Sequence, residues 1–178
     1  MATGSATTKA PSRHDARARQ LIEMTIDSLA EVGFTGTTLA EIGKRADVSP
    51  GLVAHYFKDK NGLLEAAFRA LAFRHGDAVR LRMIAADSPR ARVQAVIDAS
   101  LSRTEIDLRT SMAWLAFWGQ ALQHPRLHRV QRAYQKRMLS NLTHALRAME
   151  TPEEARKTAA LIAAMIDGDV FGKVVLTL

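Results

Sequence analysis

The sequence lacks cysteine altogether and has no long apolar run. None of its 178 residues is Cys, which excludes disulfides, thiolate metal sites and a cysteine nucleophile and favours an intracellular protein. No apolar stretch approaches the roughly 20 residues that a membrane-spanning helix needs, and the first dozen residues contain no apolar signal-peptide core. The sequence therefore predicts a cytoplasmic protein that does not enter a membrane.

Acidic residues are outnumbered by basic ones. The 18 Asp and Glu residues stand against 25 Lys and Arg residues, which gives a formal net charge of +7. This balance favours a polyanionic partner, nucleic acid first. Residues 1–12 are mostly small and polar and are interpreted as a disordered basic arm. A second basic run lies far downstream, where its simplest interpretation is a solvated helix face: Arg126, Arg129, Arg132, Lys136 and Arg137.

The motifs of common enzymes are also absent. The chain has no nucleophile elbow, no glycine-rich phosphate loop and no paired acids at motif spacing. His124 and His128 are four residues apart, a spacing that zinc ligands use on a helix, but Pro125 interrupts the helix between them and no third ligand is nearby. We therefore expect no metal, no cofactor and no enzymatic activity.

Helical periodicity runs through almost the whole chain. Strand alternation is absent, and apolar residues recur every three or four positions between clear start and stop signals. The sequence therefore predicts an all-α fold. The expected helices cover about residues 12–32, 38–46, 50–57, 59–83, 89–102, 108–123, 126–149 and 151–170.

Two of these helices are short and joined by a tight turn. Thr38 and Glu41 match a capping box at the start of the first, and Ser49-Pro50 is an N-cap serine followed by proline at the start of the second. Gly43 costs helix stability, so its missing side chain predicts a close helix crossing. The inward-facing residues of the pair are Leu39, Ile42, Gly43, Ala46, Val48, Val53 and Phe57.

That burial pattern leaves the start of the second short helix facing outward, as a reader of the DNA major groove requires. Free backbone N–H groups there, and at the next helix start near Lys60, can bind phosphates. Any helix–helix corner of a bundle has the same pattern, so an architectural protein without DNA specificity is an alternative. The predicted DNA-binding residues are Thr37, Thr38, Ser49, Pro50, Gly51, Leu52, His55, Tyr56 and Lys60.

The run from Thr37 to Lys60 resembles the helix-turn-helix of the TetR family of bacterial repressors. Ala54 departs from the family, which often has a DNA-contacting aromatic there, so His55 or Tyr56 takes over that contact in this interpretation. The resemblance implies a DNA-binding domain at 13–60, an effector-binding and dimerisation domain at 61–178, and a homodimer on a pseudo-palindromic double-stranded operator, released by a small molecule. The matching positions are Thr37-Thr38, Ile42-Gly43, Val48-Ser49, Gly51, Tyr56-Phe57 and Lys60.

A narrower resemblance, to the choline-responsive BetI-type regulators, covers most of the chain. It implies control of choline-to-glycine-betaine genes, with choline or a related quaternary ammonium compound as effector. Such chains usually continue through another helix, whereas this one stops at Leu178, so either the dimer bundle is incomplete or the sequence is a shortened form. A TetR-family repressor for another lipophilic or cationic ligand, such as one controlling an efflux gene, is the alternative. The matching runs are 48–64, 114–118, 124–132, 140–142 and 163–168.

Both tryptophans of the chain lie in one predicted helix, on a face with Phe117. Tryptophan faces attract quaternary ammonium groups by cation–π interaction, about 0.5–2 kcal/mol each. A carboxylate would complete such a cage, and Glu105, Asp107 and Asp98 are near in sequence. The alternative is that the stripe is ordinary core and that His75 merely packs. The predicted ligand-binding residues are Trp114, Phe117, Trp118, Glu105 and His75.

The last predicted helix carries a stripe of small apolar residues suited to close helix packing. We predict that this stripe forms the homodimer interface. The alternative is that it packs only within its own subunit. Its members are Ala155, Ala159, Ile162, Ala163 and Ile166.

Overall fold

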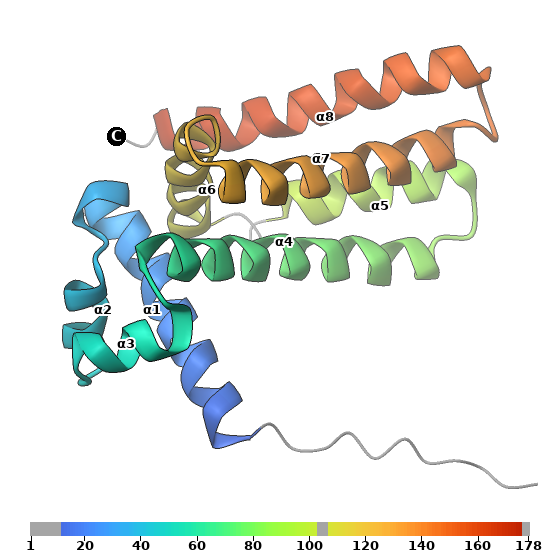
Figure 1. Ribbon diagram of the computed structural model, residues 1–178. Coiled ribbons are helices and arrows are strands. Elements are labelled where there is room, and N and C mark those ends of the chain that lie inside the picture. The colour runs from blue at the N-terminus through green and yellow to red at the C-terminus, as the bar shows by residue number, and fades with distance from the viewer. Residues whose placement is uncertain (1–11, 103–106, 176–178) are drawn as a thin grey trace, which may run out of the picture.

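The computed structural model describes residues 12–102 and 107–175, except for the Lys173 side chain. These residues form eight α-helices and no strand, so the predicted all-α fold is confirmed. Helices α1 to α3 gather at one end of the molecule, α4 runs from them to the opposite end, and α8 lies beyond α7, away from α4 (Figure 1). The bounds are α1 Arg13–Gly36, α2 Leu39–Arg45, α3 Pro50–Phe57, α4 Lys60–Ala85, α5 Pro89–Leu101, α6 Leu108–Ala121, α7 Pro125–Leu146 and α8 Pro152–Val175.

The predicted helix starts are confirmed by side-chain caps. The Thr38 hydroxyl accepts a hydrogen bond from the Glu41 N–H at 3.1 Å, and the Ser49 hydroxyl accepts one from the Leu52 N–H at 3.1 Å. At α8, Thr151 and Glu154 bond reciprocally, as a capping box requires. Each cap satisfies backbone donors that a helix start leaves free, which is why these short polar residues mark the boundaries.

The end of α1 differs from the prediction. We expected the helix to stop at about Val32, before Gly33. Gly33 does leave the helical conformation, with φ +67°, but the chain turns back into a helix and continues to Gly36. A left-handed φ is open to glycine at no steric cost, so Gly33 makes a kink here and not an end.

Three groups of buried residues hold the helices together. The first packs α1, α2, α3 and the start of α4 around Ile42 and Val53. The second joins α1, α4 and α6 with parts of α7 and α8 around Phe68 and Phe117, and the third fills the far end between α4, α5, α7 and α8. The second group therefore ties α1 directly to helices α4–α8, which are called the effector half below because the sequence predicts the effector site there. No helix in residues 12–102 or 107–175 is long and apolar enough to span a bilayer.

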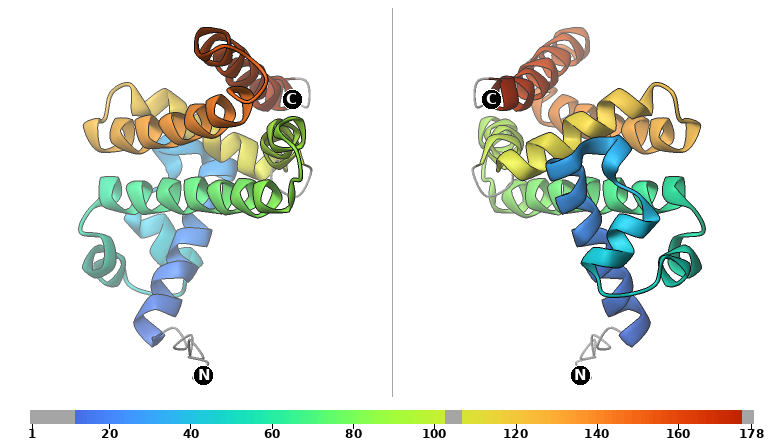
Figure 2. Two further views of the ribbon diagram at one scale, coloured as in Figure 1. Left: turned by 90° about the vertical axis from the view of Figure 1, so that its right-hand side faces the viewer. Right: turned by 90° about the vertical axis from the view of Figure 1, so that its left-hand side faces the viewer.

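The predicted dimerisation stripe faces inward and must be corrected. Ala155 and Ala159 have no exposed surface, and Ile166 is buried with them against α4, α5 and α7. Ile162 and Ala163 are partly buried against the same group. These side chains stabilise their own subunit, as the alternative interpretation held. The outer side of α8, which forms one edge of the molecule in Figure 2, instead exposes Leu161, Met165, Phe171 and Val175.

Candidate DNA-binding and effector sites

The α2–α3 pair forms a tight helix-turn-helix. A methyl group added at Gly43 would lie 2.8 Å from the Val48 carbonyl oxygen and 3.2 Å from the Pro50 nitrogen, so the turn passes directly over this glycine. Asp47 adopts a left-handed φ of +53°, which Asp tolerates better than most residues. Arg45 ties α2 to α1 through an ion pair with Glu31 of α1 at 2.8 Å, and a second ion pair with Glu41 of its own helix, also at 2.8 Å, holds the guanidinium in place. These contacts fix the angle at which α3 is presented.

The start of α3 is presented to solvent, as the sequence predicted. Ser49, Pro50, Gly51, Leu52 and His55 are all exposed, whereas Val53 between them is fully buried. Thr38 is likewise exposed at the start of α2. The outward residues belong to the first turns of a short helix, which is the part of a recognition helix that reaches base edges.

Tyr56 is half-buried at the side of this surface and contacts the start of α1. Its ring lies 4.5 Å from the His14 ring, centroid to centroid, and 5.8 Å from the His55 ring, edge-on. Tyr56 also packs against the buried residues of α1–α3. The phenol is therefore held in one place beside the exposed face of α3.

Thr37 is placed away from this surface. Its side chain is completely buried, and its hydroxyl donates to the Gly33 carbonyl oxygen at 2.8 Å and lies 3.0 Å from the Ser28 hydroxyl. The hydroxyl thus holds the α1–α2 connector in place, and the prediction of a DNA contact by this side chain is corrected.

The Lys60 side chain also makes its contacts within the protein. Its Nζ donates to the Phe34 carbonyl oxygen at 2.6 Å and lies 4.4 Å from the Phe34 ring centroid. Burial lowers the pKa of Lys60. The side chain therefore ties the start of α4 to the α1–α2 connector. The backbone N–H groups at the start of α4, and not the Lys60 side chain, are then the groups that can bind a phosphate.

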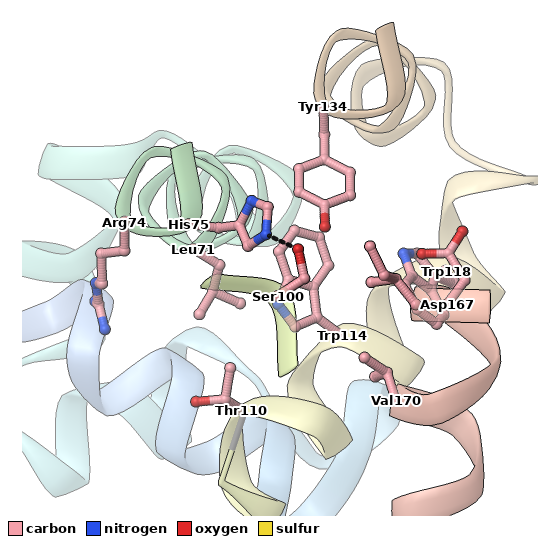
Figure 3. A pocket seen from close by; sticks show the side chains of 11 residues that line it. Leu71, Arg74, His75, Ser100, Thr110, Trp114, Trp118, Tyr134, Asp167 and Val170 are labelled. Atoms are coloured by element: carbon pink, nitrogen blue, oxygen red, sulfur yellow. Dashed lines mark hydrogen bonds between the residues drawn. The ribbon is translucent and has the colours of Figure 1, made fainter. Parts of the chain in front are cut away.

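A cavity lies in the effector half, between α4, α5, α6, α7 and α8 (Figure 3). Its volume is about 80 Å³, on a scale where one water molecule takes about 10–15 Å³, so it suits a ligand of few non-hydrogen atoms. Of the predicted ligand-binding residues, Trp114, Trp118 and His75 line it. Glu105 lies outside the described residues. The other lining residues are Leu71, Arg74, Ser100, Thr110, Tyr134, Ile166, Asp167 and Val170.

Three aromatic rings form one wall of the cavity. Trp114 lies 4.8 Å from Tyr134 and 6.2 Å from Trp118, centroid to centroid. The Trp118 indole N–H is buried and has no hydrogen-bond partner in the part of the chain that the structure describes. Phe117 is the exception among the predicted aromatics: it does not line the cavity but stacks on Phe68 at 3.6 Å within the core.

The charged groups around the cavity favour a cation. Asp167 is the acidic residue that lines it, and partial burial raises the pKa of its carboxyl group. Arg74 is paired with Glu23 of α1, so its charge is compensated. Burial, and to a lesser extent the nearby charge of Arg82, lowers the pKa of His75 to about 4, so its ring is neutral at pH 7. His75 Nε2 lies 2.9 Å from the Ser100 hydroxyl (Figure 3).

The sequence interpretation missed Tyr134 and Asp167. Tyr134 stands inside the basic run of α7, and Asp167 stands in a segment noted only for its resemblance to BetI-type regulators. Their approach to Trp114 depends on how α7 and α8 pack on α6. The carboxylates suggested from sequence lie elsewhere: Asp98 is exposed and accepts from Gln94, and Asp107 caps the start of α6.

A set of ion pairs joins the cavity to α1. Arg74 of the cavity wall pairs with Glu23, and Arg109, next to the lining residue Thr110, pairs with Asp27 and lies 3.7 Å from Glu23. Since α1 also packs on the helix-turn-helix, these ion pairs connect the cavity wall to the helix that supports α2 and α3. Within the described ranges, no cluster of three or more His, Asp or Glu side chains could hold a metal ion.

Comparison with known proteins gives matches for both halves of the chain. Residues 21–67 match the family "Bacterial regulatory proteins, tetR family", and residues 89–170 match "BetI-type transcriptional repressor, C-terminal". The HTH-type transcriptional regulator BetI of Klebsiella pneumoniae is 42% identical over 154 residues, covering 85% of this chain and 79% of the relative. The regulator of the same name from Escherichia coli K12 is 40% identical with the same coverage.

Solved structures agree with this assignment. A protein described as a transcriptional regulator from Pseudomonas aeruginosa superposes with a TM-score of 0.82 at 27% identity, over 97% of this chain and 86% of that one. A regulator structure from Saccharomonospora viridis in complex with choline gives a TM-score of 0.76 at 18% identity, over 88% and 83% of the two chains, and shows the shared fold.

The helix-turn-helix and the helical effector half define a DNA-binding transcriptional regulator. Both matched families consist of regulators, which are not enzymes. The chain belongs to the TetR family and carries a C-terminal domain of the BetI type.

Proposed function

We propose that this regulator is a repressor that leaves its operator when choline or a closely related quaternary ammonium compound binds the cavity. The observation that carries the proposal is the composition of the cavity, which combines three aromatic rings with one carboxylate, Asp167, and a neutral His75. The choline complex of the Saccharomonospora viridis protein of the same fold supports this choice.

The physical argument concerns a cation that cannot donate hydrogen bonds. A quaternary ammonium group binds through ring faces, at about 0.5–2 kcal/mol each, and through the charge of a carboxylate. Trp114, Trp118 and Tyr134 supply the rings, and Asp167 supplies the charge. The unpartnered Trp118 N–H matches the hydroxyl oxygen of choline, which is an acceptor. The small cavity volume favours choline over bulkier lipophilic cations.

In the operator complex, α3 enters the major groove. Ser49, Gly51 and Leu52 approach base edges and nearby phosphates, and His55 lies on the same exposed face. Tyr56 and the backbone N–H groups at the start of α4 contact the phosphates that flank the groove. Ala54 is small and half-buried, so the contacts of this helix come from its neighbours.

Release follows from the ion pairs that join the cavity to α1. A ligand drawn toward Asp167 on α8 and Trp114 on α6 favours the conformation in which α4 and α6 close around it. Glu23 and Asp27 transmit that movement to α1 through Arg74 and Arg109. The two reading heads of a dimer then no longer fit half-sites one helical turn apart.

The dimer needed for such an operator forms through the outer faces of α7 and α8. Leu161 and Met165 are exposed by 66% and 74% on α8, and Leu139 is exposed on α7. Apolar side chains of this size in a row mark an interaction surface. This face replaces the stripe at Ala155–Ile166 predicted from the sequence.

The test is calorimetric titration of the protein with choline and with 3,3-dimethylbutan-1-ol, which has the same shape without the charge. We expect choline to bind at least about tenfold more tightly, since loss of the charge removes both the cation–π and the Asp167 contributions. Asp167→Asn should weaken choline binding by a similar factor. The matched control is Asp98→Asn, at an exposed position of α5, which should leave choline binding unchanged.

Equal binding of the two compounds, or equal effects of the two Asp→Asn changes, would remove the quaternary ammonium assignment. A TetR-family regulator for another ligand would then be the better description.

A further inference from the structure

A second hollow lies on the other side of His75 and Tyr134, in the groove between α4 and α7. These two side chains line both hollows and separate them. The groove is larger than the first cavity, with a volume of about 280 Å³. Its apolar floor is formed by Val79, Val96, Val130 and Met138, all buried.

Among the described residues, three arginines line this groove and no acidic residue does. Arg69 pairs with Glu65 at 2.9 Å, whereas neither Arg129 nor Arg137 has an ion pair within the described residues. The Arg137 guanidinium lies over Gly76, 3.7 Å from where a side chain would begin, so it packs closely over this part of α4. The groove thus places uncompensated positive charge beside buried apolar surface.

The basic run of α7, which the sequence suggested was a solvated face, is therefore divided between two surfaces. Arg129 and Arg137 are eight residues apart, about two helical turns, and point to the groove with α4. Arg132 and Lys136 line the opposite groove, between α7 and α8. Phe73 stands at the arginine groove with 63% of its surface exposed, an aromatic side chain that a ligand tail would cover.

We propose that the α4–α7 groove binds an amphipathic organic anion, namely a carboxylate with an apolar tail. Arg129 and Arg137 hold the carboxylate by charge-assisted hydrogen bonds. The tail lies along Val79, Val96 and Met138 beneath Phe73. This site is independent of the quaternary ammonium cavity, because the two have opposite charge requirements and only His75 and Tyr134 in common.

The test is calorimetric titration with octanoate and with octan-1-ol, which carries the same tail without the charge. We expect octanoate to bind at least about tenfold more tightly, the change that one charge-assisted hydrogen bond produces. The double variant Arg129→Ala/Arg137→Ala should lose this preference. The double variant Arg132→Ala/Lys136→Ala, which removes the same charge from the same helix on its other side, should keep it.

Equal binding of octanoate and octan-1-ol would overturn the proposal, as would an equal loss in both double variants. Circular dichroism of each variant checks that α7 remains folded. Choline titration of Arg129→Ala/Arg137→Ala separates the two sites: retained choline binding with lost octanoate binding supports two sites, and loss of both contradicts their independence.

Discussion

His75 lies in the wall between the two hollows, and burial holds its pKa at about 4 against an ordinary value of 6.5. The unfolded chain therefore takes up a proton first as the pH falls from 6.5 to 4. Above pH 6.5, His75 does not change the free energy of unfolding. As the pH falls from 6.5 to 4, the cost of keeping His75 neutral lowers the free energy of unfolding by on the order of 3 kcal/mol.

The prediction at this residue is that His75→Gln removes part of the acid sensitivity. Urea unfolding at pH 7 and at pH 4.5 should show a smaller loss of free energy of unfolding for this variant than for the unchanged protein. His128→Gln is the control, because His128 is exposed on α7 and lines neither hollow. Identical pH profiles for all three proteins would contradict a neutral, buried His75.

At the residue scale, the sequence predicted part of the cavity lining. Trp114 and Trp118 are four residues apart and share the face that meets the cavity, whereas Phe117 is rotated from it far enough to enter the core. Asp167 could not be chosen over Asp98 or Asp107, since its distance from Trp114 depends on the packing of α8 and not on sequence spacing. The same holds for Thr37, whose burial depends on the kink at Gly33.

At the element scale, the helix-turn-helix depends on the missing side chain of Gly43. Gly43→Ala should gain up to about 1 kcal/mol of helix propensity but place a methyl group 2.8 Å from the Val48 carbonyl oxygen. Overpacking of this kind costs about 1–3 kcal/mol, so we expect a net loss of stability.

Gly51→Ala is the matched control for Gly43→Ala. A methyl group there meets only the Ser49 hydroxyl, at 3.8 Å, and the variant should keep or gain stability. Urea unfolding measures both. If the Gly43→Ala protein were as stable as the Gly51→Ala protein, the α2–α3 turn would have room for a methyl group at Gly43, and the tight packing argued above would be contradicted.

Most elements could be predicted because local signals fix them. Thr38, Ser49 and Asp59 cap helix starts with their own side chains, so these boundaries need no tertiary information. The buried face of α8 could not be predicted in this way. It is apolar on both sides, with Ala155 and Ala159 on one and Leu161 and Met165 on the other, and only the packing of α8 on its neighbouring helices decides which side is buried.

At the scale of the whole molecule, the exposed side of α8 should carry the dimer. Leu161→Asp places a charge on that face and should convert a dimer to a monomer in light scattering after size-exclusion chromatography. Leu81→Asp is the matched control, since Leu81 is the same residue type, 60% exposed, on α4. A dimer that survives Leu161→Asp, or falls apart equally with Leu81→Asp, would exclude α8 as the interface.

In the proposed mechanism, operator binding at α3 is coupled to ligand binding in the cavity between α4 and α8 through α1 and the ion pairs of Glu23 and Asp27. If choline weakens operator binding as proposed, linkage requires that the operator weaken choline binding by the same factor. Neither half alone tests this claim.

The most direct test is the fluorescence anisotropy of a labelled duplex from the region upstream of the gene, titrated with the protein at fixed salt with and without choline. The account predicts tight binding that saturating choline weakens by at least about tenfold, a coupling of about 1.4 kcal/mol. Tight DNA binding that is unchanged at choline concentrations that fill the cavity would contradict it.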